Sequence, residues 1–331
     1  MRRITVHKIT LHRITQLGMK PATKTPSRLR VYAAVGMAAA VGLTLSACGS
    51  SSPKSNPLSS GGSKGSVIIG AANFYESDVL ADIYQQALEA KGIKVTVKSN
   101  IGAREVYYPE IEKGALTIIP EYNGALLTTS VDTTSTAATT AQVDAALTAD
   151  LPKSLEILNP SPAQDADSVT VTAATAAKDH LTSIADLAPF AKNMVFGGPS
   201  EFNTRSDGIP GLRKNYGLVF NHFHTTDESS TITFTDLMNG VVQAADVFTT
   251  SPQIITDHLK VLADPKNNFA AQNVLPLVYK PDVNPTIVST LNAISAKLTT
   301  AGLLAMDKAL VINHAGYSSV AAGWLKAVGL G

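Results

Sequence analysis

The chain has 331 residues, with 27 lysines and arginines against 26 aspartates and glutamates, so its formal charge is +1. Hydrophobic residues make up 44% of the chain and charged residues 16%. So apolar a composition excludes a chain that is disordered along its whole length. The length favours two lobes of roughly 100–200 residues each. The near-neutral charge argues against a nucleic-acid binder, and the single cysteine excludes an internal disulfide framework or a cysteine-rich metal site.

The amino-terminal segment 1–47 has the pattern of an export signal. It carries eight positive and no negative charges, and it includes the uncharged stretch Val31–Leu45, rich in Ala, Val and Leu. A basic region followed by a short apolar region and small residues is typical of a secretory signal peptide. The fifteen apolar residues are fewer than the roughly 20 that a membrane-spanning helix needs. A buried amphipathic helix is the alternative. A start at Met19 instead of Met1 would give the basic region an ordinary length.

The end of this segment, Leu45-Ser46-Ala47-Cys48, resembles the bacterial lipobox, in which the cysteine is lipidated and becomes the first mature residue. A free thiol after ordinary cleavage is the alternative. Residues 48–65 are rich in Gly, Ser and Pro and predict a flexible tether. Without residues 1–47 the chain has 19 basic and 26 acidic residues, a charge of −7. We therefore expect an acidic protein, lipid-anchored at the extracytoplasmic face of the cell membrane.

From Val67 onward, short apolar runs alternate with segments of helical periodicity, as in βαβ units. The expected strands are 67–70, 95–97, 116–119, 168–172, 194–196 and 246–248. The expected helices are 76–91, 104–113, 210–216, 235–239, 251–258, 287–299, 303–311 and 320–328, and residues 130–149 should open as a loop and end as a helix. The pattern predicts an α/β fold with mixed, mostly parallel sheets flanked by helices.

Enzyme motifs are missing from the sequence. It contains no P-loop, dinucleotide fingerprint, nucleophile elbow or H-E-x-x-H motif. His222 and His224 could share one strand face, but a metal site would need further ligands, and an exposed or core pair is the favoured interpretation. We therefore expect no catalytic residues, no cofactor and no metal.

Three stretches resemble the substrate-binding lipoproteins of ABC importers for quaternary-amine osmoprotectants, namely glycine betaine, choline, carnitine and proline betaine. Residues 70–76 (GAANFYE) are similar to the family's G-S-K-x-F-x-E, and residues 120–124 (PEYNG) to P-E-Y-T-G. Residues 201–212 (EFNTRSDGIPGL) are similar to E-F-x-x-R-x-D-G-x-x-G-L. Residues 246–250 and 262–266 are weaker matches, and the resemblance extends over 66–331 in the same order.

The resemblance implies a two-lobed periplasmic-binding-protein fold of type II, with the ligand in the cleft between the lobes. One lobe would comprise 66–167 and 263–331, and the other 168–262. The chain would cross between them near Asp167–Val169 and Leu262–Asp264. The implied partners are a small solute and ABC permease subunits with their ATPase, which would read lobe closure. The receptor itself would be a monomer that binds no nucleic acid.

The ligand chemistry points to particular side chains. A quaternary ammonium is held by aromatic faces, and a carboxylate is best held by an arginine fork. The resemblance implies that Tyr122 and Phe248 belong to an aromatic cage and that Arg205 clamps a carboxylate, with Glu201 orienting Arg205 or touching the ligand. The alternatives are core packing for the two aromatics, and an ion pair of Arg205 with Glu201 or Asp207.

The sequence also departs from the family pattern. Ala72 and Asn123 replace the family's lysine and threonine, and polar residues replace two aromatic positions. The cage therefore looks incomplete, and Phe74, Tyr75 or Tyr107 could complete it. A pocket richer in hydrogen bonds, for a larger or more polar solute, is indicated by Asn123, Asp165, Asp167 and Gln272. The ligand stays open, as does the alternative of a binding-fold surface protein without transport.

Overall fold

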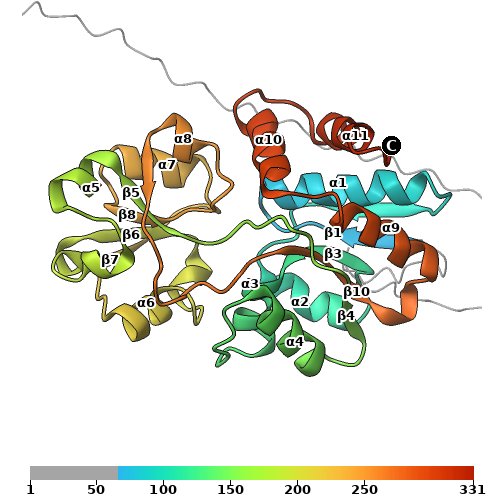
Figure 1. Ribbon diagram of the computed structural model, residues 1–331, viewed down its shortest axis with the longest axis horizontal. Coiled ribbons are helices and arrows are strands. Elements are labelled where there is room, and N and C mark those ends of the chain that lie inside the picture. The colour runs from blue at the N-terminus through green and yellow to red at the C-terminus, as the bar shows by residue number, and fades with distance from the viewer. Residues whose placement is uncertain (1–65) are drawn as a thin grey trace, which may run out of the picture. The chain divides into compact units, whose positions relative to one another are not determined.

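The computed structural model describes residues 66–331; the expected signal peptide, Cys48 and the tether lie outside the described residues. Two five-stranded sheets, each with its own helices, form two lobes (Figure 1). The first sheet has the order β2-β1-β3-β10-β4 and consists of β1 (Val67–Gly70), β2 (Val95–Lys98), β3 (Ile118–Tyr122), β4 (Leu155–Ile157) and β10 (Val274–Tyr279). The second has the order β7-β6-β8-β5-β9 and consists of β5 (Val169–Thr172), β6 (Val195–Gly198), β7 (His222–Thr225), β8 (Ala244–Asp246) and β9 (Leu259–Val261).

Helices cover both sheets (Figure 1). The first lobe carries α1 (Tyr75–Glu89), α2 (Arg104–Glu112), α3 (Asn123–Leu126), the π-helical turn η1 (Leu127–Val131), α4 (Thr140–Asp150), the 3-10 turn η5 (Lys280–Asp282), α9 (Pro285–Ser295), α10 (Thr300–Val311) and α11 (Tyr317–Ala327). The second carries α5 (Ala173–Asp179), α6 (Ile209–Tyr216), α7 (Thr231–Met238), α8 (Gln253–Thr256) and the 3-10 turns η2 (Ile184–Leu187), η3 (Ala191–Asn193) and η4 (Ser200–Asn203). Helix α1 buries Val79, Leu80 and Ile83 completely and packs against α9, α10 and α11. The expected α/β fold with mixed sheets is confirmed.

Antiparallel pairing has a larger share than the sequence pattern indicates. In each sheet two strand pairs are parallel and two are antiparallel. The antiparallel pairs arise where the chain enters a sheet from the other lobe. Strand β10 lies between β3 and β4 and opposes both, and β5 does the same between β8 and β9. The strand by which the chain enters each sheet from the other lobe, β10 or β5, therefore runs antiparallel to both of its neighbours.

The two crossings between the lobes run side by side. Gln164 and Asn273 form an antiparallel bridge, and the amide of Asp165 donates to the carbonyl of Gln272 at 3.2 Å. The second crossing lies a few residues later than the expected Leu262–Asp264. Ala263 still pairs with the second lobe, and the Phe269 ring packs on that lobe's core, so the chain leaves the second lobe only after Phe269.

Several short elements differ from the expected ones. The third strand begins at Ile118 and extends to Tyr122, so the whole P-E-Y motif lies inside it. The expected helix 251–258 is reduced to the single turn α8, and the expected strand 246–248 ends at Asp246. Strands β4, β9 and β10 and helices α3 and α5 were not expected, and β7 was considered only as a strand that could carry His222 and His224. Residues 130–149 open as a loop and lead into α4, as expected.

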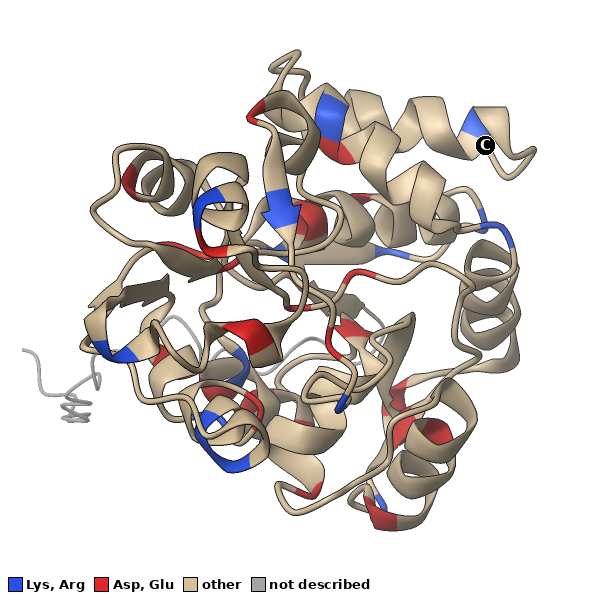
Figure 2. Ribbon diagram, turned by 60° about the vertical axis from the view of Figure 1, so that its left-hand side comes forward, with Lys and Arg blue, Asp and Glu red and all other residues tan. Residues whose placement is uncertain are grey.

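Charged residues are dispersed over the fold. In the view of Figure 2, lysines and arginines lie on separate elements of both lobes and do not gather on one face. Within residues 66–331, no single helix is long and apolar enough to cross a membrane, while the bent pair α9 and α10 meets that criterion only by combined length and composition.

Candidate ligand-binding site

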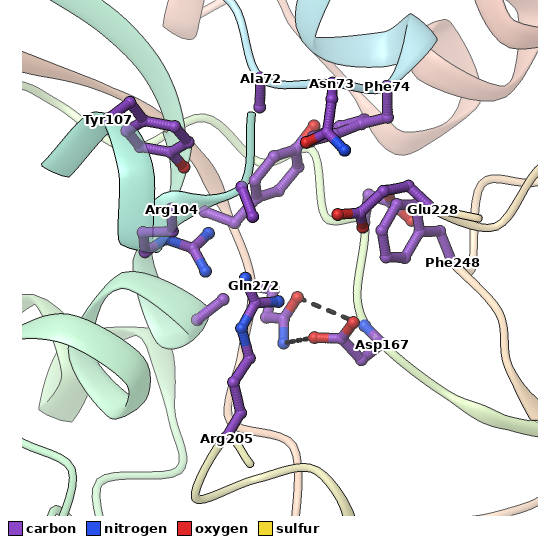
Figure 3. Close-up of a pocket in the computed structure, with 14 residues that line it drawn as sticks. Ala72, Asn73, Phe74, Arg104, Tyr107, Asp167, Arg205, Glu228, Phe248 and Gln272 are labelled. Atoms are coloured by element: carbon purple, nitrogen blue, oxygen red, sulfur yellow. Dashed lines mark hydrogen bonds between the residues drawn. The ribbon is translucent and has the colours of Figure 1, made fainter. Parts of the chain in front are cut away.

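A pocket lies between the two lobes. Its walls come from the loops and first helical turns that follow β1, β2, β3 and β8, from the two crossings, and from the Arg205 and Glu228 loops of the second lobe (Figure 3). The lining residues are Ala72, Asn73, Phe74, Ala103, Arg104, Tyr107, Tyr122, Ala125, Asp165, Asp167, Arg205, Glu228, Phe248 and Gln272. Most of these loops leave the carboxyl ends of strands, which is where α/β folds place ligands.

Aromatic rings form one side of the pocket. Phe74 lies 6.0 Å from Tyr122 and 5.4 Å from Phe248, measured between ring centroids. Phe74 and Tyr122 belong to the first lobe and Phe248 to the second, so both lobes contribute to this aromatic wall. Tyr107 also lines the pocket, and its hydroxyl donates to Glu121 at 2.7 Å. Polar and charged side chains make up much of the remaining lining.

Glu76, beneath this wall, ties the two lobes together. It is 1% exposed and accepts a 2.5 Å hydrogen bond from the Tyr122 hydroxyl in the first lobe. Its other oxygen accepts a 2.9 Å hydrogen bond from the Thr250 hydroxyl in the second lobe. Burial, then the nearby Asp307, raises the pKa of Glu76 well above its usual value.

Arg104 enters the pocket from the start of α2 but is already neutralised. Its Nη2 and Nε atoms lie 2.9 and 3.0 Å from the carboxylate of Glu121, which is fully buried. Its remaining nitrogen donates to Thr129 at 3.2 Å. The glutamate of the P-E-Y motif therefore compensates a buried arginine, an arrangement that charge burial requires.

Arg205 reaches from the second lobe into the pocket and forms a fork with Glu105 of the first lobe. Its Nε and Nη2 atoms donate to the two carboxylate oxygens at 2.9 and 3.0 Å. Arg205 is therefore paired neither with Asp207 nor with Glu201. Glu105 orients the guanidinium, whereas Glu201 accepts a hydrogen bond from the Ser200 hydroxyl and lies outside the pocket lining. Figure 3 shows the guanidinium pointing between Arg104 and Gln272.

Acidic side chains face the pocket on the side opposite Arg104. Asp167 exchanges two hydrogen bonds with Gln272, at 2.9 Å through its side chain and 3.3 Å through its amide (Figure 3). Burial, followed by contact with Glu201, raises the pKa of Glu228 well above its usual value. Burial and Glu76 do the same for Asp165. Both arginines are paired outside this acidic group, so a positive charge placed in the pocket would favour the ionised forms of these carboxyls.

Of the eleven residues expected at the site, the structure brings eight into the pocket lining and leaves Glu201, Tyr75 and Asn123 outside it. The eight are Phe74, Tyr107, Tyr122, Asp165, Asp167, Arg205, Phe248 and Gln272. Tyr75 lines a neighbouring cavity instead, and Asn123 is fully buried, where it donates to Asp144 at 2.7 Å. Sequence reasoning missed Asn73, Arg104 and Glu228. Asn73 lies inside a quoted motif, but the other two carry no motif signal.

The histidine pair does not form a metal site. His224 lies 3.0 Å from Asp236, and among residues 66–331 no group of three or more potential ligands could hold a metal ion.

The fold and the interlobe pocket define a two-lobed binding protein, and comparison with known proteins identifies its family. Residues 65–327 match the model of the substrate-binding domain of ABC-type glycine betaine transport systems, and the chain belongs to this family. Members are the extracytoplasmic, non-enzymatic components of ABC importers that bind the solute.

The chain is also similar to individual proteins and to solved structures. The chain is 26% identical to the glycine betaine-binding protein YehZ of Escherichia coli over 276 residues, which is 80% of this chain and 90% of that protein. Over 102 residues it is 33% identical to the ergothioneine transport permease/ergothioneine binding protein EgtU of Helicobacter pylori, covering 31% of this chain and 18% of that protein. A crystal structure of a glycine betaine/carnitine/choline ABC transporter protein shares the fold, with a TM-score of 0.62 and 22% identity over 80% of this chain and 99% of that one.

Proposed function

We propose that this substrate-binding protein is anchored through a lipid on Cys48, captures a small quaternary amine or betaine between its lobes and delivers it to an ABC permease. The pocket supports the ligand class through one arrangement, in which the Phe74, Tyr122 and Phe248 rings face a space bordered by Asp165 and Asp167. A quaternary ammonium has no hydrogen to donate, so it needs aromatic faces and negative charge around it.

The carboxylate of a betaine would meet an arginine that already has a partner. Glu105 occupies the Nε/Nη2 edge of the Arg205 guanidinium, and the Nη1/Nη2 edge can still hold a ligand carboxylate. Because Glu105 already offsets the charge of Arg205, a carboxylate gains less there than at an unpaired arginine. We therefore expect a cation without a carboxylate, such as choline, to bind at least as well as glycine betaine.

Calorimetric titration with choline, glycine betaine, carnitine and proline betaine tests the proposal. We expect choline to bind, and Phe248→Ala to weaken binding by about tenfold or more, in keeping with a desolvated cation–π contact of about 2 kcal/mol. Phe190→Ala is the control, because Phe190 packs in the second-lobe core away from the pocket lining. If none of the four solutes binds, the proposed ligand class is wrong.

A more polar solute is the second candidate. The hydrogen-bonded Asp167–Gln272 pair and Asn73 also offer hydrogen bonds that a quaternary ammonium, which has no N–H group, cannot make, and one relative is named as an ergothioneine-binding protein. Mass spectrometry of the solute retained by gently purified protein distinguishes the two candidates.

Lipid anchoring has its own test. The full chain and its Cys48→Ser variant are expressed in bacteria fed radioactive palmitate. We expect label and membrane association only in the chain with Cys48. Equal membrane association of both would contradict the anchor.

A further inference from the structure

Three buried carboxyl groups lie directly behind the aromatic wall of the pocket. Glu76 on α1, Asp165 on the first crossing and Asp307 on α10 are 1%, 4% and 0% exposed. Asp165 also lines the pocket. One of its oxygens accepts from the Thr250 amide at 2.9 Å and from the Thr249 hydroxyl at 3.2 Å. The cluster is therefore continuous with the binding site and spans the junction of the two lobes.

The surrounding protein does not neutralise this cluster. Neither oxygen of Asp307 has a hydrogen-bond partner of good geometry, and none of the ion pairs within residues 66–331 includes a member of the cluster. The pocket's two arginines are paired with other glutamates. The other ionisable groups that face the cluster are Tyr75, Tyr122 and Asp167.

Buried carboxyls without compensating charge retain protons. Burial, then mutual repulsion, raises the pKa of Glu76 and of Asp165 well above the usual range, and burial raises the pKa of Asp307 to about 8. At neutral pH the cluster therefore holds at least one proton more than isolated carboxyls would.

We propose that Glu76, Asp165 and Asp307 together form the counter-charge for a cationic ligand, and that the cation enters the pocket in exchange for a proton. A positive charge beside Asp165 stabilises the ionised form of the cluster by Coulomb attraction in a poorly hydrated site. The protonated protein and the cation thus give the complex and one free proton. This inference rests on the proposed function, and it selects cations over neutral solutes of the same size.

Titration of the full-length, detergent-solubilised protein with choline tests the exchange. Between pH 6 and 8 we expect the association constant to rise with pH, by up to about tenfold per unit if one proton is released. Repeating the titration in buffers of different ionisation enthalpy counts the protons directly. Above the Asp307 pKa of about 8, the part of the rise that comes from Asp307 should level off, because that residue has then lost its proton before choline arrives.

Two variants sharpen the test. Asp307→Asn keeps the shape of the side chain but cannot release a proton, so the proton count should fall by at least half. Asp150→Asn, at the exposed end of α4, should keep the wild-type count. If Asp307→Asn does not fold, the wild-type proton count alone decides. Choline binding with equal affinity at pH 6 and 8 and without proton release overturns the exchange but leaves the proposed function standing. Absence of binding by both choline and glycine betaine at every pH overturns both.

Discussion

The hydroxyl of Tyr122 donates a 2.5 Å hydrogen bond to Oε1 of Glu76 and so joins two motifs that lie 46 residues apart in the sequence. Strands β1 and β3 are parallel neighbours, and Glu76 follows the first while Tyr122 ends the second. Their carboxyl ends therefore meet at one edge of the sheet. Since Thr250 of the other lobe also donates to Glu76, the residue that positions an aromatic wall of the pocket also links the lobes.

Removing the Tyr122 hydroxyl tests how much its hydrogen bond to Glu76 contributes to the stability of the protein. Tyr122→Phe keeps the ring but leaves a buried carboxyl oxygen without its donor, so we expect the free energy of unfolding to fall by about 1–3 kcal/mol. Urea denaturation measures the change. Tyr279→Phe is the matched control, because the Tyr279 ring is half-buried and no hydrogen bond of its hydroxyl is found within residues 66–331. Equal stability of the two variants would contradict the assigned role of the Tyr122 hydroxyl.

The ion pair between Arg205 and Glu105 leads to a prediction about ligand specificity. Glu105→Gln removes the negative charge that competes for the guanidinium fork, so affinity for glycine betaine should rise several-fold while affinity for choline changes less than about twofold. Because Glu105 is 46% exposed, the stability cost should stay below about 1 kcal/mol. Parallel titrations with both solutes measure the difference. An equal effect on the two ligands would show that Arg205 does not face a ligand carboxylate.

Much of the fold could be predicted from the sequence because its long elements carry strong periodic signals. Helix α1 buries Val79, Leu80 and Ile83 at helical spacing, and such a pattern needs no tertiary information. Strands β4 and β9 have only three residues each, and Pro276 interrupts the apolar run of β10. These strands form because their neighbours supply partners. That information is non-local, and single-sequence patterns do not contain it.

Site residues that lie in sequence motifs could be predicted. The sequence did not show which charged side chains pair with one another. Phe74, Tyr122 and Arg205 stand in recognisable stretches, and all three line the pocket. The partner of Arg205 is Glu105, which lies 100 residues away and has no motif of its own. Arg104 was missed for the same reason, since only the fold brings Glu121 against it. Which charges are free for a ligand depends on such long-range pairs.

The glycine of the R-x-D-G motif fixes the loop that carries Arg205. A Cβ atom on Gly208 would lie 1.9 Å from the carbonyl oxygen of Phe202, well inside contact distance. Gly208→Ala should therefore destabilise the protein by about 2 kcal/mol or more, because backbone must move to relieve the clash. Gly323→Ala is the control, since a Cβ there meets nothing within 4 Å and Gly323 lies inside α11. That variant should gain up to about 1 kcal/mol. Thermal denaturation compares the two, and similar melting temperatures would refute the close approach at Gly208.

The buried carboxyl of Asp307 also predicts how stability depends on pH. Burial raises its pKa to about 8 in the folded protein, whereas an aspartate in an unfolded chain titrates near pH 3.9. Between these values the folded state binds more protons than the unfolded state, so the free energy of unfolding falls as the pH rises and levels off above about pH 8. One such proton sets a slope of up to about 1.4 kcal/mol per pH unit.

Other buried acids, among them Glu228 and Asp246, have raised pKa values because of burial and add to the same slope. The informative quantity is therefore the difference between the wild type and Asp307→Asn, measured by urea denaturation at intervals from pH 5 to 9. We expect the variant to show a shallower slope below pH 8 and the two curves to run parallel above it. If the slopes are equal throughout, Asp307 is ionised in the folded protein and its carboxylate has found a partner.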